Sequence, residues 1–192
     1  MSLEPLVTVV SPLYNGERHV RGLVDCVLAQ TYTNWRLVIV DNHSKDGTQT
    51  LASEYAARDE RVRVVRNPET VDVISNHNAG FREIPPDSVY FRFLQADDRL
   101  QDHALAKAVT LAESNPRVGI VGSHLKWGEE TASAEFDRGV LVHPGTEVAA
   151  RTLLGETYPC LSPSALLFRM AAVRRRQPFF APDYLYADLS LI

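Results

Sequence analysis

The chain has 192 residues, of which 45% are hydrophobic and 23% charged, and this composition excludes a disordered chain and a collagen-like repeat. Its formal net charge of −4 argues against nucleic acid as a partner. The sequence holds no apolar stretch of about 18 residues, the length that a membrane-spanning helix requires. We therefore expect a soluble, cytoplasmic domain of ordinary size.

Short apolar segments alternate with amphipathic ones through the first 121 residues. In chain order they predict a strand at 6–10, a helix around 20–28, a strand at 35–40, a helix at 46–57, a strand at 62–65, a helix at 73–81, a strand at 89–94, a helix at 105–112 and a strand at 118–121. Asp46 and Gln49 have the spacing of a capping box, which would open the second helix. This alternation predicts an α/β fold with three layers, in which helices cover both faces of a mainly parallel, mixed sheet.

The periodicity is weaker after residue 122. Residues 126–145 are polar and contain spaced glycines, which indicates a loop or a hairpin that lies over the sheet. Further along, the pattern predicts a helix at 147–154, a strand at 165–168 and a helical or extended piece at 184–192. We expect residues 1–192 to form a single domain.

Polar and aromatic side chains follow three of the predicted strands at their carboxyl ends. Tyr14 lies past the first strand, Asp41 past the second, and Asp97 and Asp98 past the fourth. Ligands of open parallel sheets bind at this edge. Adjacent carboxylates repel each other unless a cation offsets their charge, and oxygen ligands suit Mg²⁺ or Mn²⁺. The pair therefore predicts a metal site, although the same residues could instead cap the following helix from solvent.

Several common catalytic and cofactor motifs are absent from the sequence. It contains no G-x-G-x-x-G dinucleotide motif and no G-x-x-x-x-G-K-[ST] phosphate loop. It also lacks H-E-x-x-H and G-x-S-x-G, which argues against a zinc protease and an α/β-hydrolase.

The order and spacing of the motifs resemble those of the family 2 glycosyltransferases, which have the Rossmann-like GT-A fold. The resemblance is carried by residues 7–17 (VTVVSPLYNGE), 27–32 (VLAQTY), 38–48 (VIVDNHSKDGT), 76–80 (NHNAG) and 93–98 (FLQADD). It is strong over about the first 115 residues and weaker beyond them. It divides the domain into a nucleotide-binding half at about 5–122 and an acceptor half at about 123–192.

The resemblance implies a transferase that moves a sugar from a nucleotide diphosphate to an acceptor hydroxyl with inversion at the anomeric carbon. It assigns a set of nucleotide-binding residues, which are Pro12, Tyr14, Glu17, Asp41, Asn76 and Asp97. Asp41 would accept a hydrogen bond from the base. Asp97 would contact the ribose or the metal, and Asp98 would bind Mn²⁺ or Mg²⁺ directly. The chain departs from the family pattern at Gln95, which takes the place of the first acid in D-A-D-D.

An inverting transfer needs a base that takes the proton of the acceptor hydroxyl. The segment from Pro182 to Leu191 resembles the late family segment in which an acid precedes an apolar helix, so Asp188 is the candidate base and Asp183 the second choice. The alternative is that Asp188 only caps a terminal helix. Because Asp188 lies close to the end of the sequence and no helix stop follows, we expect a catalytic core truncated at its C-terminus.

The implied donors are UDP-, dTDP- or GDP-sugars, and the implied acceptor is a glycan or a lipid-linked molecule of cell-wall or surface polysaccharide synthesis. Such an acceptor would bring the enzyme to the inner face of the membrane as a peripheral protein. The Gln95 departure leaves a second interpretation open, a non-catalytic module that binds nucleotide sugars. A nucleotidyltransferase is disfavoured because residues 11–16 lack a glycine-rich, basic phosphate loop.

Overall fold

The computed structural model describes residues 4–132, 140, 142–156, 162–174 and 178–181. The strands in it are β1 (Val7–Leu13), β2 (Trp35–Asp41), β3 (Val62–Arg66), β4 (Tyr90–Phe93), β5 (Ile120–Gly122), β6 (Leu125–Trp127), β7 (Glu130–Ala132) and β8 (Leu166–Arg169). The helices are α1 (Glu17–Leu28), α2 (Thr48–Ala56), α3 (Val73–Arg82), α4 (Ala104–Ser114), α5 (Gly145–Leu153) and α6 (Met170–Val173), with a 3₁₀ helix, η1, at Pro163–Ala165. The strands and helices expected up to residue 121 are all present, with ends shifted by a few residues. The piece expected at 184–192 lies outside the described residues.

Six strands form the central sheet, in the order β3-β2-β1-β4-β8-β5. β1 pairs in parallel with β2 and β4, and β2 pairs in parallel with β3. β8 is antiparallel to both of its neighbours, β4 and β5. The predicted α/β fold with a mainly parallel, mixed sheet is therefore confirmed. β6 and β7 form a separate antiparallel hairpin, which is one of the two possibilities, a loop or a hairpin, expected for residues 126–145.

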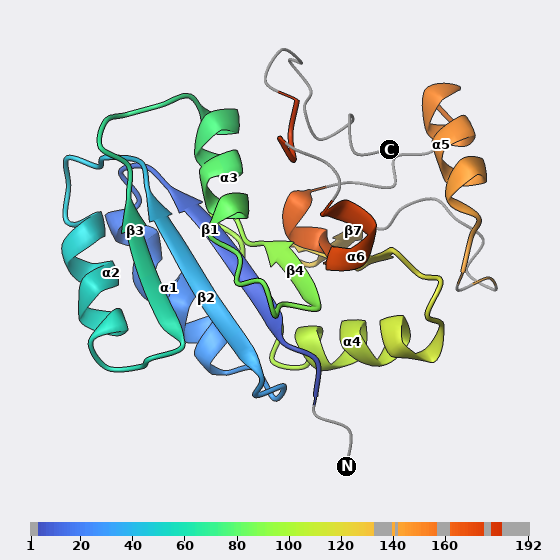
Figure 1. Ribbon diagram of the computed structural model, residues 1–192, viewed down its shortest axis with the longest axis horizontal. Helices are drawn as coiled ribbons and strands as arrows, with labels where there is room; N and C mark the ends of the chain where they lie inside the picture. Colours follow the sequence, from blue (N-terminus) through green and yellow to red (C-terminus); the bar gives the residue numbers. More distant parts are fainter. Residues whose placement is uncertain (1–3, 133–139, 141, 157–161, 175–177, 182–192) are drawn as a thin grey trace.

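Helices cover both faces of the sheet because the buried strands carry apolar side chains on both sides (Figure 1). Val9 of β1 packs into the core beneath α1 and α4, whose buried residues are Val20, Leu23, Val24, Val27, Leu105, Val109 and Ala112. The next residue, Val10, faces the opposite core, which is rich in aromatic rings: Phe81, Phe91, Phe93, Phe168, Phe179 and Phe180. The result is the expected arrangement of three layers.

The first strand ends three residues later than the sequence indicated, at Leu13. The Val10 carbonyl accepts a hydrogen bond from Leu94 N, and the Leu13 carbonyl accepts one from Asn42 N, so alternate residues of β1 face β4 and β2. The nitrogen of Pro12 therefore faces the β4 side, past the last ladder pair at Val10 and Phe93. A proline is accommodated there because no partner strand requires its missing N–H.

Candidate functional site

The carboxyl ends of β1, β2 and β4 lie at one edge of the sheet because these strands run in parallel. Four predicted site residues follow or end these strands. Tyr14 is 52% exposed just past β1, and Asp41 ends β2 with no exposed surface. Past β4, Asp97 is exposed and Asp98 is half-buried. The topology thus brings together at one edge the aromatic ring and the carboxylates that the sequence placed at the strand ends.

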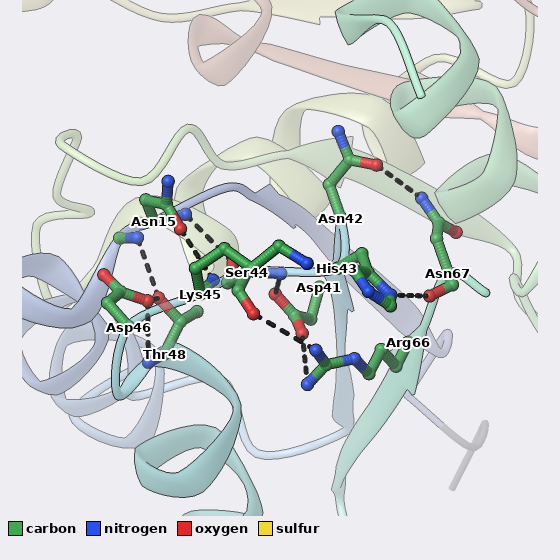
Figure 2. A network of polar contacts seen from close by, with 11 residues as sticks. Asn15, Asp41, Asn42, His43, Ser44, Lys45, Asp46, Thr48, Arg66 and Asn67 are labelled. Carbon is green, nitrogen blue, oxygen red and sulfur yellow. Dashed lines mark hydrogen bonds and ion pairs between the residues drawn. The ribbon is translucent and has the colours of Figure 1, made fainter. Parts of the chain in front are cut away.

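Asp41 is held in place by the backbone and by an arginine of β3. Its Oδ1 accepts a hydrogen bond from Ser44 N at 3.1 Å, and its Oδ2 lies 3.4 Å from Nη1 of Arg66 (Figure 2). Arg66 Nη2 also donates to the Ser44 carbonyl at 3.1 Å. Oδ2 is buried beside this guanidinium and makes no hydrogen bond in the structure.

The loops after β1 and β2 are tied to each other by backbone amides. Asn15 N donates to Ser44 Oγ at 2.9 Å, and Lys45 N donates to Asn15 Oδ1 at 2.9 Å (Figure 2). Gly16 N donates to Thr48 Oγ1 at 2.8 Å. Asn15 adopts a φ of 48°, a left-handed conformation that asparagine tolerates. These contacts hold the N-terminus of α1 against the N-terminus of α2.

Glu17 joins the same junction through its carboxylate. Glu17 Oε2 accepts a hydrogen bond from Gly47 N at 2.8 Å, and Asp46 Oδ2 accepts one from Glu17 N at 3.1 Å. α2 begins at Thr48 with Gly47 as its N-cap, so the expected Asp46–Gln49 capping box is wrong. Asp46 Oδ1 instead accepts a hydrogen bond from Thr48 N at 3.0 Å. The amide of the N-cap residue Gly47 donates to Glu17, which lies in the neighbouring helix α1.

Asn76 lies in α3 and is only 4% exposed. Its Oδ1 accepts a hydrogen bond from Asn67 Nδ2 at 2.9 Å, and the same Asn67 nitrogen donates to Asn42 Oδ1 at 2.9 Å. Asn42 also exchanges two hydrogen bonds with the backbone of Val71. The three amides therefore hold the loops that follow β2 and β3 against α3, next to Asp41.

Gln95 replaces an acid of the family pattern, and its environment suits an amide. His77 Nδ1 lies 2.7 Å from the Val73 carbonyl, which can only accept, so Nδ1 carries the proton. Burial lowers the pKa of His77, which favours the neutral ring, and Nε2 then accepts from Gln95 Nε2 at 3.0 Å. A carboxylate at position 95 has no N–H to donate, so it could not form this hydrogen bond with the Nε2 lone pair of a neutral His77.

Asp97 and Asp98 fit the chemistry of a magnesium or manganese site. Both carboxylates reach solvent, and neither takes part in an ion pair within the described ranges. No cluster of three or more His, Cys, Asp or Glu side chains that could bind a metal occurs in the part of the chain that the structure describes. Mg²⁺ and Mn²⁺ commonly use one or two protein carboxylates and complete their shell with water and phosphate. Asp97 and Asp98 would hold such an ion at the end of β4.

Several further residues lie beside this pair and were not predicted from the sequence. Arg92 lies in β4 and is 2% exposed, and burial lowers the pKa of its guanidinium to about 10. Its signal in the sequence was a lone charge inside an apolar strand. Ser162 Oγ donates to Asp98 Oδ2 at 3.3 Å, and Ser164 Oγ accepts from Gln95 N at 2.9 Å. No sequence signal marked these two serines, since they are 64 and 69 residues from their partners.

The candidate base Asp188 and its alternative Asp183 lie outside the described residues. Within those residues, no helix is both long and apolar enough to cross a membrane.

Two kinds of sequence comparison relate the chain to known glycosyltransferases. The profile of glycosyl transferase family 2 matches residues 8–176. An uncharacterized glycosyltransferase of Haemophilus influenzae is 24% identical over 96% of this chain, and the match covers 58% of that protein. The putative teichuronic acid biosynthesis glycosyltransferase TuaG of Bacillus subtilis is 33% identical over 54% of this chain, and the match covers 40% of TuaG. The chain thus spans about half the length of these curated relatives.

Solved structures share the fold at low sequence identity. Mannosyltransferase PcManGT from Pyrobaculum calidifontis, in complex with GDP-Man and Mn²⁺, superimposes with a TM-score of 0.73 and 21% identity, covering 99% of this chain and 51% of that one. S. aureus TarS 1-349 in complex with UDP superimposes with a TM-score of 0.72 and 14% identity, covering 97% and 53%. These neighbours have the GT-A fold. The profile match and the curated relatives together show that the chain belongs to glycosyl transferase family 2.

Proposed function

We propose that the chain contains the donor-binding and catalytic region of a metal-dependent, inverting glycosyltransferase. The observation that carries this proposal is the gathering of Asp41, Asp97 and Asp98 at one edge of the sheet, in a member of family 2. In open parallel sheets this edge is where nucleotides bind. Residues at about 5–122 would bind the donor, and those at about 123–192 would face the acceptor.

The donor we propose is a nucleotide diphosphate sugar with UDP, dTDP or GDP. Related structures hold UDP, UDP-GlcNAc, or GDP-Man with Mn²⁺, which supports this class. Asp41 Oδ2, buried without a hydrogen bond, would accept one from the base. Pro12, Tyr14, Glu17 and Asn76 complete the proposed nucleotide pocket, but Glu17 and Asn76 would act mainly by holding its walls, because their side chains already bond within the protein.

The reaction we propose is a single displacement at the anomeric carbon. The acceptor oxygen forms the new glycosidic bond while the bond to the diphosphate oxygen breaks, and the electron pair leaves with the nucleoside diphosphate. Asp188 would take the proton of the acceptor hydroxyl as general base. A divalent metal, when bound, offsets the charge that develops on the leaving diphosphate. Asp97 and Asp98 would hold that ion, and Asp97 would also contact the ribose.

We propose glycan or lipid-linked acceptors of cell-wall or surface polysaccharide synthesis. The name of TuaG, a putative teichuronic acid biosynthesis glycosyltransferase, supports this class. Such acceptors would bring the protein to the inner face of the membrane as a peripheral enzyme. Transfer to lipid-linked and free glycan acceptors, measured with the same donor, tests the assignment directly.

Isothermal titration of UDP, dTDP and GDP with and without Mn²⁺ tests donor and metal binding. Asp98→Asn should abolish the gain in nucleotide affinity that Mn²⁺ gives the wild type. Asp87→Asn is a matched control, because Asp87 is exposed and precedes β4 at the opposite end of that strand. If the wild type binds none of the three nucleotides, or if Asp98→Asn keeps the full effect of Mn²⁺, the proposal is wrong.

Turnover separates the enzyme from a non-catalytic module that only binds nucleotide sugars. The enzyme should release free nucleoside diphosphate from at least one donor of a UDP-, dTDP- and GDP-sugar panel, and Asp188→Ala should abolish this release while donor binding persists. Donor binding without release by the wild type would favour the binding module instead.

A further inference from the structure

Arg92 is an unusual residue for the centre of a sheet. It lies in β4, is 2% exposed, and its Nε is buried without a hydrogen bond in the structure. Its Nη2 donates to the carbonyl of Ser164, which belongs to the 3₁₀ helix η1 just before β8. Burying a guanidinium is costly unless it is paired or solvated. Arg92 therefore fixes η1 to the strand that leads into Asp97 and Asp98.

Two more contacts hold η1 in the same place. Gln95 N donates to Ser164 Oγ at 2.9 Å, and β8 continues from η1 as the antiparallel neighbour of β4. Ser162 precedes η1 as its N-cap, and its Oγ accepts from Ser164 N at 3.2 Å. Backbone and side-chain contacts thus position Ser162 beside the carboxyl end of β4.

The hydroxyl of Ser162 reaches the acidic pair. Its Oγ donates to Asp98 Oδ2 at 3.3 Å, whereas Asp97 is exposed. We propose that Ser162 is a positioning residue that holds the Asp98 carboxylate in the orientation that binds the metal and the donor diphosphate. This inference rests on the proposed function, in which Asp98 is a metal ligand.

The physical reason is the flexibility of an unrestrained carboxylate beside a like charge. Asp97 and Asp98 are adjacent, so their repulsion favours orientations in which the two side chains point apart. A hydroxyl that donates to Oδ2 restrains Asp98 and leaves its second oxygen for a ligand. Burial lowers the pKa of Arg92, and the negative charge of Asp98 opposes this effect, so the two side chains attract each other.

Three variants distinguish a role of Ser162 in positioning Asp98 from a role in protein stability alone. Ser162→Ala removes the donor, and Ser162→Thr retains it. Ser123→Ala is the matched control, because Ser123 Oγ donates to the Ala165 carbonyl at 2.8 Å and so contacts η1 without reaching Asp98. The measurements are thermal unfolding, and titration of UDP, dTDP and GDP with and without Mn²⁺, taking the nucleotide that the wild type binds best.

Ser162→Ala should reduce the gain in affinity that Mn²⁺ gives by about 5- to 10-fold, the size of one ordinary intramolecular hydrogen bond, with little change in affinity without metal. Ser162→Thr should restore the gain to within about twofold, and Ser123→Ala should retain it. If Ser162→Ala keeps the full gain in affinity on adding Mn²⁺, or if Ser123→Ala loses as much of it, the role of Ser162 is overturned. The proposed function is not affected by either result. Absence of any Mn²⁺ effect in the wild type contradicts the proposed function instead, and the inference with it.

Discussion

The side-chain amide of Asn78 pairs with the backbone of Phe180 across 102 residues of sequence. Asn78 Nδ2 donates to the Phe180 carbonyl at 2.9 Å, and Asn78 Oδ1 accepts from Phe180 N at 2.8 Å. The ring of Phe180 lies 5.5 Å from that of Phe93 and 5.7 Å from that of His77. One asparagine of α3 thus holds a late segment of the chain against the aromatic core.

Asn78→Ala should lower the free energy of unfolding by about 1–3 kcal/mol, because it leaves a buried N–H and a buried C=O of Phe180 unpaired. Hydrogen exchange at the Phe180 amide should accelerate more than exchange in β1. Arg82→Ala, at an exposed position of the same helix, is the control and should change neither. Unchanged exchange at Phe180 in Asn78→Ala would show that this pair does not hold the segment.

The glycine of the N-x-N-x-G motif allows α3 to approach the sheet closely. A Cβ on Gly80 would lie 2.5 Å from Val10 Cγ1 and 3.3 Å from Val40 Cγ2. Gly80→Ala should therefore destabilise the protein by about 1–3 kcal/mol in urea unfolding. Gly145→Ala is the matched control, since no atom lies within 4 Å of its added Cβ. Equal stability of the two variants would contradict this packing argument.

Variants of Glu17 distinguish a structural role, holding the loop at Gly47, from direct contact with the nucleotide. Glu17→Ala removes the acceptor of Gly47 N and should lower the free energy of unfolding by about 1 kcal/mol, whereas Glu17→Gln keeps an acceptor oxygen and should lose less. Nucleotide affinity, measured by titration, should follow stability in both variants if Glu17 acts by holding the loop. A loss of affinity in Glu17→Gln at full stability would instead indicate direct contact with the nucleotide.

The fold could be predicted well where burial on both faces makes strands apolar throughout. β1, β2 and β4 were recognisable for this reason, and their polar ends located Asp41, Asp97 and Asp98. The order of the strands within the sheet could not be predicted from the sequence. β8 enters the sheet between β4 and β5, far from either in sequence, and nothing in a four-residue strand, Leu166–Arg169, specifies its neighbours.

The details of the site depended on contacts between distant residues. The sequence marked Glu17 and Asn76 by motif, but only the structure shows that Gly47 and Asn67 occupy their side-chain oxygens. Ser162 carried no signal at all, because its hydroxyl meets Asp98 only when β8 lies beside β4. Spacing along the chain reports local structure, whereas these contacts follow from the order of strands in the sheet.

His77 should make stability depend on pH near neutrality. Its ring is buried, its Nδ1 proton lies on the Val73 carbonyl, and burial lowers its pKa below the ordinary 6.5. As the pH falls through about 6.5, the unfolded chain binds a proton that the folded protein does not. The free energy of unfolding should therefore fall below this pH, and the fall should end only where the folded ring itself is protonated.

Urea unfolding at several pH values between 7.5 and 5.5, without metal, measures this effect. The slope contributed by His77 should reach up to about 1.4 kcal/mol per pH unit, the value for one proton. His77→Asn should remove that slope, whereas His124→Asn, at an exposed position, should keep it. The lowered pKa values of Asp46, Asp59 and Asp72 affect stability only at more acidic pH, since each lies below the ordinary 3.8. If His77→Asn retains the wild-type slope, the buried ring is not the group that responds to pH, and the neutral His77 that accepts from Gln95 has to be reconsidered.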